Sequence, residues 1–170
     1  QIAAGGTHSA AVCEAGAVWT WGDGACGKLG HGNQRRYATP LLVERFVAMK
    51  VRVREVSAGG RHTLAVTTEG ELFVWGSNAV GQLGLAWNAV GLGNGTPGSD
   101  LPTLVDVGDA QTTVQSASAG EEHSLVLTDK GKVYAMGDNS NGALGLGNVP
   151  MAELAARAIP GSDLPIQIDV

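Results

Sequence analysis

The chain contains three copies of one glycine-punctuated pattern, and this internal repeat constrains its fold more than any other feature. The copies superpose without gaps over residues 3–30, 57–84 and 118–145. In each copy, a histidine stands 13 residues before a Trp or Met and 21 residues before a leucine. The histidines are His8, His62 and His123, and the positions that follow are Trp21, Trp75 and Met136. Agreement at fixed offsets predicts one supersecondary unit built three times.

Glycines and apolar runs predict what that unit is. In every copy a glycine separates two apolar runs, where a tight hairpin needs a positive φ. The runs, such as 63–66 and 72–75, have the near-continuous apolar character of strands covered on both faces. A further strand precedes each histidine, and another follows a proline. Each copy ends in a Gly-x-Leu-Gly tail, and the glycines that open this tail are Gly27, Gly81 and Gly142. Four antiparallel strands in about 50–60 residues predict an all-β fold of β-propeller blades.

The proline-led strand sets the predicted limits of the blades. If that strand opens its blade, residues 1–39 form a partial blade, 40–101 and 102–164 two whole blades, and 165–170 the first strand of another. Rings usually hold about 4–8 blades, so a partial ring of about three does not close. An open array would leave strand edges bare, so we expect the chain to be part of a longer propeller. The alternative is self-association of two copies into one ring.

Composition and charge exclude several classes of partner. The formal net charge of −5 and the isoelectric point near 5.2 argue against a nucleic-acid surface, which needs a basic stripe. Two cysteines, Cys13 and Cys26, make no disulfide framework in a chain of this size and fit a reducing compartment. No apolar run has the length of a membrane span, and no signal segment is visible. We expect an intracellular protein, cytoplasmic or nuclear.

The equivalent histidines raise the question of a metal site. Stacked sheets lie about 10 Å apart, whereas zinc ligands lie about 2 Å from the ion. Histidines on neighbouring blades therefore cannot share one metal, and we expect each to be structural and hydrogen-bonded within its own blade. The fourth histidine, His31, stands in a loop with no evident partner. No Ser/His/Asp or Cys/His grouping is evident, so we predict no catalytic residues and no metal.

One segment, 22–27, matches the G-x-G-x-x-G pattern of a dinucleotide-binding loop. That loop needs a helix beginning at the pattern to hold a pyrophosphate. Here the pattern continues into Lys28-Leu29-Gly30, and the matching segments of the other two copies lack the middle glycine. We interpret the segment as a turn and expect no cofactor.

Partner contacts are expected on the loops that a propeller displays on its two rims. The longest loop, 85–101, holds Trp87, which is either a binding hot spot or a local plug, and both interpretations stay open. A short helix over 151–159, ended by Pro160-Gly161, is interpreted as a cap over blade edges. The candidate partner contacts are Trp87, the basic pair Arg35 and Arg36, and the variable residues before the repeat histidines, Arg61, Glu121 and Glu122.

The motifs resemble those of a known repeat. The Ala-Gly-Gly-x-His-Ser/Thr element, the Val-Trp/Phe-x-Trp-Gly strand, the Gly-x-Leu-Gly tail and the proline-led strand are similar to the regulator of chromosome condensation repeat over essentially the whole chain. The resemblance implies a seven-bladed propeller. It also implies one of several roles: guanine-nucleotide exchange on the small GTPase Ran, ultraviolet sensing in plants, or scaffolding. The plant photoreceptors often have Trp where this chain has Gly60, so light sensing is not expected.

We therefore expect a non-enzymatic protein–protein interaction or scaffold module, a subunit or regulator in a larger assembly. The alternative is a guanine-nucleotide exchange factor for a Ran-like small GTPase, which distorts the nucleotide site of its partner and needs no acid–base residues of its own. No exchange-loop motif is recognisable in the sequence, which favours the scaffold. The acidic balance disfavours a chromatin-binding role.

Overall fold

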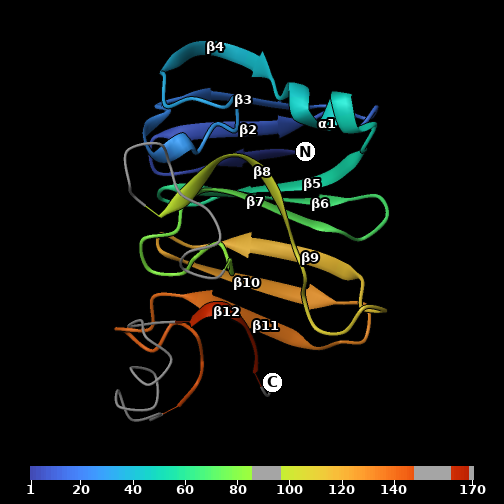
Figure 1. Ribbon diagram of the computed structural model, residues 1–170, viewed down its shortest axis with the longest axis vertical. Helices are drawn as coiled ribbons and strands as arrows, with labels where there is room; N and C mark the ends of the chain where they lie inside the picture. The colour runs from blue at the N-terminus through green and yellow to red at the C-terminus, as the bar shows by residue number, and fades with distance from the viewer. Residues whose placement is uncertain (86–96, 148–161, 169–170) are drawn as a thin grey trace.

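The protein is built from three four-stranded antiparallel sheets stacked along its long axis (Figure 1). The computed structural model describes residues 1–85, 97–147 and 162–168. The first sheet contains β1 (Ile2–Ala4), β2 (His8–Val12), β3 (Val18–Gly22) and β4 (Tyr37–Leu42). The second contains β5 (Val53–Ala58), β6 (His62–Thr67), β7 (Leu72–Ser77) and β8 (Gly98–Val105). The third contains β9 (Val114–Ala119), β10 (His123–Thr128), β11 (Val133–Gly137) and β12 (Ser162–Ile168).

This architecture confirms the predicted all-β fold of four-stranded propeller blades, about three of them in the chain. Strands pair in the order of the sequence, each antiparallel to the next. The predicted hairpin glycines join the second and third strands of each sheet, and Gly70, for example, has a φ of +80°. A side chain at Gly70 would also collide with the Cβ atom of Thr113, 2.7 Å from the position of its own Cβ.

The proline-led strands lie in different sheets from those predicted. Pro40, Pro102 and Pro165 are inside β4, β8 and β12, which pair with β3, β7 and β11 respectively. Each such strand therefore closes the sheet before it, and the sheets span 2–42, 53–105 and 114–168 rather than the predicted blade limits. Proline has no backbone N–H to donate, so it is tolerated on an edge strand with one neighbour, which is where these strands lie.

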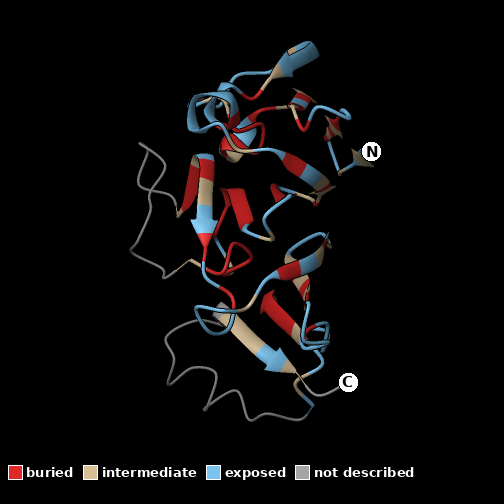
Figure 2. Ribbon diagram, turned by 90° about the vertical axis from the view of Figure 1, so that its right-hand side faces the viewer, coloured by how far each residue is buried: buried red, intermediate tan, exposed pale blue. Residues whose placement is uncertain are grey.

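The core lies between the sheets. One cluster joins the first and second sheets and includes Val18, Phe46 and Trp75, and another joins the second and third and includes Leu64 and Met136. All residues of β6 and β7 are buried, because the middle sheet is covered on both faces. Figure 2 shows this as red strands in the centre of the molecule.

A short helix, α1 (Glu44–Met49), packs against the core between the first and second sheets. Its Phe46 is 1% exposed and packs edge-on against Phe73 and Trp75, with ring centroids 5.3 Å and 5.9 Å away. Burying a phenylalanine side chain stabilises a fold by about 1.5–3 kcal/mol. The helix therefore makes the connection between two sheets part of the core.

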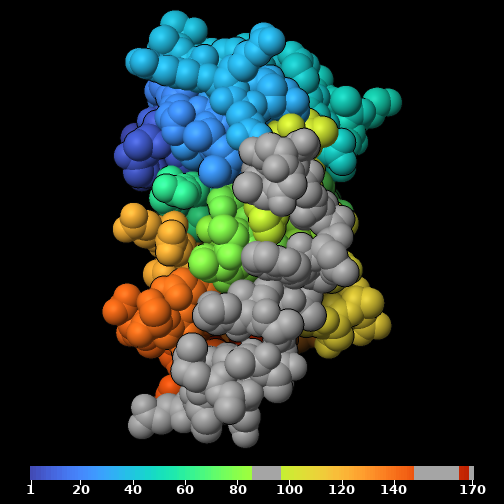
Figure 3. Space-filling model, turned by 60° about the vertical axis from the view of Figure 1, so that its left-hand side comes forward, coloured from blue at the N-terminus to red at the C-terminus, as the bar shows by residue number. Residues whose placement is uncertain are grey.

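The alternating strand directions produce two rims. The tail rim carries the turns 5–7, 59–61 and 120–122 and the described parts of the tails that follow β3, β7 and β11, residues 23–36, 78–85 and 138–147. The hairpin rim carries the hairpin turns 13–17, 68–71 and 129–132 and the connections 43–52 and 106–113. The tail rim is on the left in Figure 1 and is turned toward the viewer in Figure 3.

Candidate functional site

The repeat histidines join neighbouring sheets. His8 Nε2 lies 2.8 Å from Thr63 Oγ1, and His62 Nε2 lies 2.9 Å from Ser124 Oγ. Thr63 and Ser124 each directly follow the histidine of the next copy. For His8 and His62, the prediction that each bonds within its own blade is therefore wrong. Each ring crosses the interface because the next sheet places its hydroxyl directly opposite.

The hydroxyl groups fix the tautomer of the histidines. Thr63 Oγ1 donates to the carbonyl of Lys28 at 2.8 Å, and Ser124 Oγ donates to the carbonyl of Gln82 at 2.8 Å. Since each hydroxyl proton is used in this way, the histidine Nε2 must be the N–H donor. The Nδ1 atoms of His8 and His62 are then bare acceptors, and both are buried without a partner among the described residues.

Burial keeps these histidines neutral. It lowers the pKa of His62 to about 3, and burial together with the nearby Lys28 ammonium lowers the pKa of His8 to about 4. Neutral rings agree with the Nε2–H tautomer, since a charged imidazole would place a second proton at the unpartnered Nδ1. At neutral pH these side chains hold the sheets together.

The Trp or Met position of each copy strengthens the same interfaces. Trp75 is fully buried, and its Nε1 donates to the carbonyl of Lys28 at 2.9 Å. Its ring covers Gly30, whose Cβ would lie 2.9 Å from that nitrogen. Met136 takes the same place against Gly84 of the preceding copy. Gly30 and Gly84 therefore leave room for the bulky residue of the next blade. Trp21 of the first sheet is half-buried.

An ion pair lies at the tail rim beside these bonds. Lys28 is 2% exposed, and its ammonium binds the carboxylate of Asp23, which is half-exposed. Asp23 also accepts hydrogen bonds from Thr7 Oγ1 at 3.4 Å and from the backbone N–H of Ala25 at 3.3 Å. The hydrogen bond from Lys28 lowers the pKa of Asp23. The buried ammonium is thus balanced by a carboxylate that still faces solvent.

The segment 22–27 that resembled a dinucleotide-binding loop is a turn, as predicted. It leads into a single 3-10 turn, η1 (Ala25–Gly27), and not into an α-helix. Cys26 inside it has a φ of +62°, a left-handed conformation that side chains rarely adopt. This turn carries Asp23 and Lys28 to the rim.

A pocket of about 520 Å³ opens on the tail rim. Its charged and polar lining comes from all three copies: Thr7, Asp23, Lys28, Arg61, Glu121 and Glu122. The three predicted contacts Arg61, Glu121 and Glu122 therefore come together, and all three are exposed. The predicted contacts Arg35 and Arg36 are exposed in the first tail and do not line this pocket. Trp87 and the predicted helix over 151–159 lie outside the described residues.

Sequence reasoning missed Asp23 and Lys28, although both stand in the segment that it interpreted as a turn. It also left His31 without a partner, which is wrong. His31 Nε2 lies 2.9 Å from Thr20 Oγ1, and its ring packs edge-on against Tyr37 at 5.1 Å. Thr20 Oγ1 donates to the carbonyl of Leu29 at 2.7 Å, so His31 uses within one sheet the arrangement that the repeat histidines use between sheets.

Within residues 1–85, 97–147 and 162–168, no group of three or more His, Cys, Asp or Glu side chains is placed to hold a metal ion. The helices of this described part are too short to cross a membrane. Cys13 and Cys26 are unpaired thiols, the first exposed and the second half-buried.

Comparison with sequence families supports the repeat assignment. The sequence model of the regulator of chromosome condensation (RCC1) repeat matches residues 15–66 and 69–127. A second model of the same repeat matches residues 1–28, 53–82 and 114–143. The matched segments cover most of the chain.

Two curated relatives and one solved structure show the extent of the likeness. The human E3 ubiquitin-protein ligase HERC2 is 36% identical over 147 residues, which are 86% of this chain and 3% of the ligase. The ultraviolet-B receptor UVR8 of Arabidopsis thaliana is 36% identical over 147 residues, which are 86% of this chain and 31% of the receptor. The crystal structure of Prp20p from Saccharomyces cerevisiae superposes with a TM-score of 0.75 at 23% identity, covering 98% of this chain and 37% of Prp20p. The chain thus spans about a third or less of each of these proteins.

Proposed function

Since the chain belongs to the regulator of chromosome condensation repeat family, we propose that it is a protein-interaction module whose tail rim binds a partner protein. One observation carries this proposal: side chains from three separate repeats meet around one pocket at that rim. Arg61 comes from the second repeat, Glu121 and Glu122 from the third, and Asp23 and Lys28 from the first.

The turns that carry these groups are held against each other. The backbone N–H of Gly6 donates to the carbonyl of Gly59 at 3.1 Å, and that of Gly60 donates to the carbonyl of Glu121 at 3.1 Å. Directly behind the turns, the histidine–hydroxyl–carbonyl bonds tie the three sheets together. A surface held in one conformation loses little entropy when it binds, which favours recognition of a protein partner.

The charges at the pocket are available to a partner. Among the described residues, ion pairs form between Lys28 and Asp23, Arg54 and Glu55, and Lys130 and Asp109. Arg61, Glu121 and Glu122 take part in none of them and are exposed. Unpaired charges of both signs at a fixed spacing favour a partner surface with the complementary pattern.

The relatives are consistent with a module that serves different proteins. HERC2 is a ubiquitin ligase, UVR8 is an ultraviolet-B receptor, and Prp20p was studied for its binding to Gsp1p and histones. The chain matches 3% of HERC2 and 31% of UVR8, so we assign it neither ligase nor receptor activity. Its proposed role is the binding step within a larger assembly.

The test compares matched charge reversals on the two rims. Arg61→Glu alters the pocket, and Lys132→Glu makes the same charge change at an exposed site on the hairpin rim. Proteins captured by the wild-type chain and by each variant are quantified, and the affinity of each purified candidate is then measured by calorimetry. We expect Arg61→Glu to weaken partner binding by about tenfold or more, and Lys132→Glu to leave it unchanged. If every partner found binds all three proteins equally, the tail rim is not a binding surface.

A further inference from the structure

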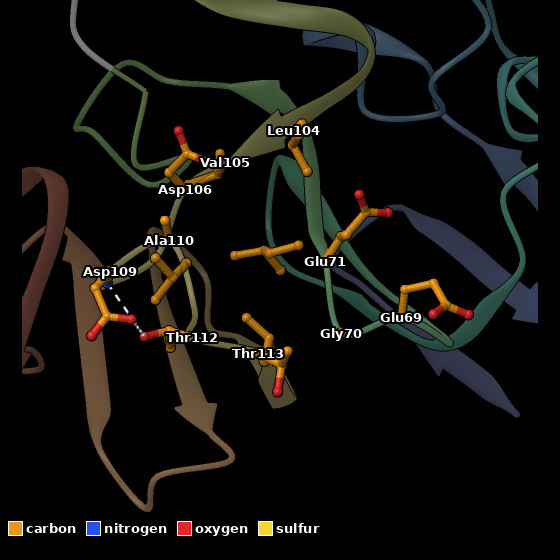
Figure 4. Close-up of a pocket in the computed structure, with 14 residues that line it drawn as sticks. Glu69, Gly70, Glu71, Leu104, Val105, Asp106, Asp109, Ala110, Thr112 and Thr113 are labelled. Carbon is orange, nitrogen blue, oxygen red and sulfur yellow. Dashed lines mark hydrogen bonds between the residues drawn. The ribbon is translucent and has the colours of Figure 1, made fainter.

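A second hollow lies on the hairpin rim. It is a groove of about 480 Å³ between the β6–β7 hairpin and the connection from β8 to β9. Figure 4 shows the hairpin residues Glu69, Gly70 and Glu71 on one side, and Asp106, Asp109 and Ala110 on the other. A volume of this order is enough to hold a small ligand or a few side chains of a peptide.

The floor of the groove is apolar. Four buried side chains from three different segments line it: Leu72, Val105, Val107 and Val114. At its edge, Leu104 is 47% exposed, one of the largest exposed fractions among the apolar side chains of the described residues. An exposed leucine that continues a buried apolar floor leaves hydrophobic area for a partner to cover.

The walls are acidic. Glu69 and Glu71 are exposed on the hairpin, and Asp106 and Asp109 are exposed on the connection. Among the described residues, the ammonium of Lys130 balances Asp109 alone, at 2.9 Å and 3.1 Å from its two carboxylate oxygens.

The neighbouring arginine is directed elsewhere. Arg54 donates from Nε to the carbonyl of Thr67 at 3.1 Å and from Nη2 to the carbonyl of Val114 at 2.9 Å, and its guanidinium also lies beside Glu55. Glu69, Glu71 and Asp106 therefore have no ion pair within the described part of the chain. The groove combines an apolar floor with an excess of negative charge.

We propose that this groove binds a short basic segment of a partner protein, with one aliphatic side chain on the apolar floor and flanking Lys or Arg side chains against the acidic walls. Charge complementarity selects this occupant, because an acidic segment would meet three unpaired carboxylates across the groove. The tail-rim pocket has charges of both signs and lies on the opposite rim, so the two surfaces are independent.

The test uses labelled peptides and fluorescence anisotropy. The probe peptide has one leucine flanked on each side by two basic residues. One comparison peptide has serine in place of leucine, and the other has glutamate in place of every basic residue. We expect the probe to bind, the serine peptide to bind about tenfold more weakly, and the glutamate peptide not to bind.

Matched double variants locate the binding. Glu69→Lys with Asp106→Lys reverses both walls of the groove. Glu14→Lys with Glu44→Lys makes the same total charge change at two sites that line neither the groove nor the tail-rim pocket. All four residues are exposed, so both proteins should fold. We expect the groove variant to bind the probe at least about tenfold more weakly and the control variant to bind it like the wild type.

Three results would overturn the proposal. The first is no binding of the probe to the wild-type chain at low salt. The second is an equal loss in both double variants, which would mean that net charge alone attracts the peptide. The third is a dimer, seen by analytical ultracentrifugation, that the groove variant abolishes, because the occupant would then be a second copy of the chain.

Discussion

The bond between the second and third sheets can be tested at one atom. Ser124 Oγ accepts from His62 Nε2 and donates to the carbonyl of Gln82, and all of these groups lie in a buried interface. Ser124→Ala removes the hydroxyl and leaves both partners unsatisfied. The Cβ atom stays in place as a methyl group, so the space left behind is that of a single oxygen atom.

The magnitude follows from the two groups that lose their partner. A buried donor or acceptor left unsatisfied costs about 1–3 kcal/mol. Since Ser124→Ala leaves one of each, we expect it to lower the free energy of unfolding by about 2–6 kcal/mol. Thr63→Val, at the interface between the first and second sheets, should lower the free energy of unfolding by about half as much. There the carbonyl of Lys28 keeps the hydrogen bond from Trp75 Nε1, and only His8 Nε2 loses its partner.

The measurement is urea unfolding followed by tryptophan fluorescence, with Ser9→Ala as the matched control. Ser9 stands at the same repeat position in the first sheet, is half-buried, and makes no side-chain hydrogen bond to any described residue. Its replacement should change the unfolding free energy by no more than about 0.5 kcal/mol. If Ser124→Ala and Ser9→Ala destabilise the protein equally, the histidine–hydroxyl–carbonyl bonds do not hold the sheets together.

Three further predictions concern the same scaffold. Acid should destabilise the protein. The pKa is about 4 for His8 and about 3 for His62 in the folded state, below the value of 6.5 in the unfolded state. The unfolded state therefore binds more protons once the pH falls below about 6.5. The unfolding free energy should then drop by about 1.4 kcal/mol per pH unit for each histidine as the pH is lowered toward 4, and a flat profile of urea midpoints between pH 7 and 5 would contradict this. Gly59→Ala should destabilise by about 1–3 kcal/mol in the same assay, because its Cβ would lie 2.5 Å from both His62 Cε1 and the carbonyl oxygen of Gly120. Gly131→Ala has no atom within 4 Å of the new Cβ and is disfavoured by its φ of +70° alone, so an equal or larger loss there would contradict the steric argument. Finally, we expect the chain to leave the release of labelled GDP from purified small GTPases unchanged, and acceleration would replace the scaffold proposal by the exchange-factor alternative.

Local residue chemistry was enough to predict the repeating unit. Glycines such as Gly70 mark tight hairpins because glycine adopts the positive φ of these turns at no steric cost. The apolar runs on either side of Gly70 form strands that are covered on both faces. The three copies and the hairpin that joins the second and third strands of each sheet follow from this pattern.

The tertiary structure alone decided which copy each contact belongs to. In a repeat, a bond from one position to another has the same sequence signature whether it stays within a copy or crosses to the next. For this reason the sequence could not show that His62 reaches Ser124, that β8 closes the sheet before it, or that Asp23 and Lys28 lie beside Arg61. The stacking of the sheets decides between a bond within one copy and a bond to the next copy. It places the hydroxyl of one sheet opposite the buried histidine of the sheet before it.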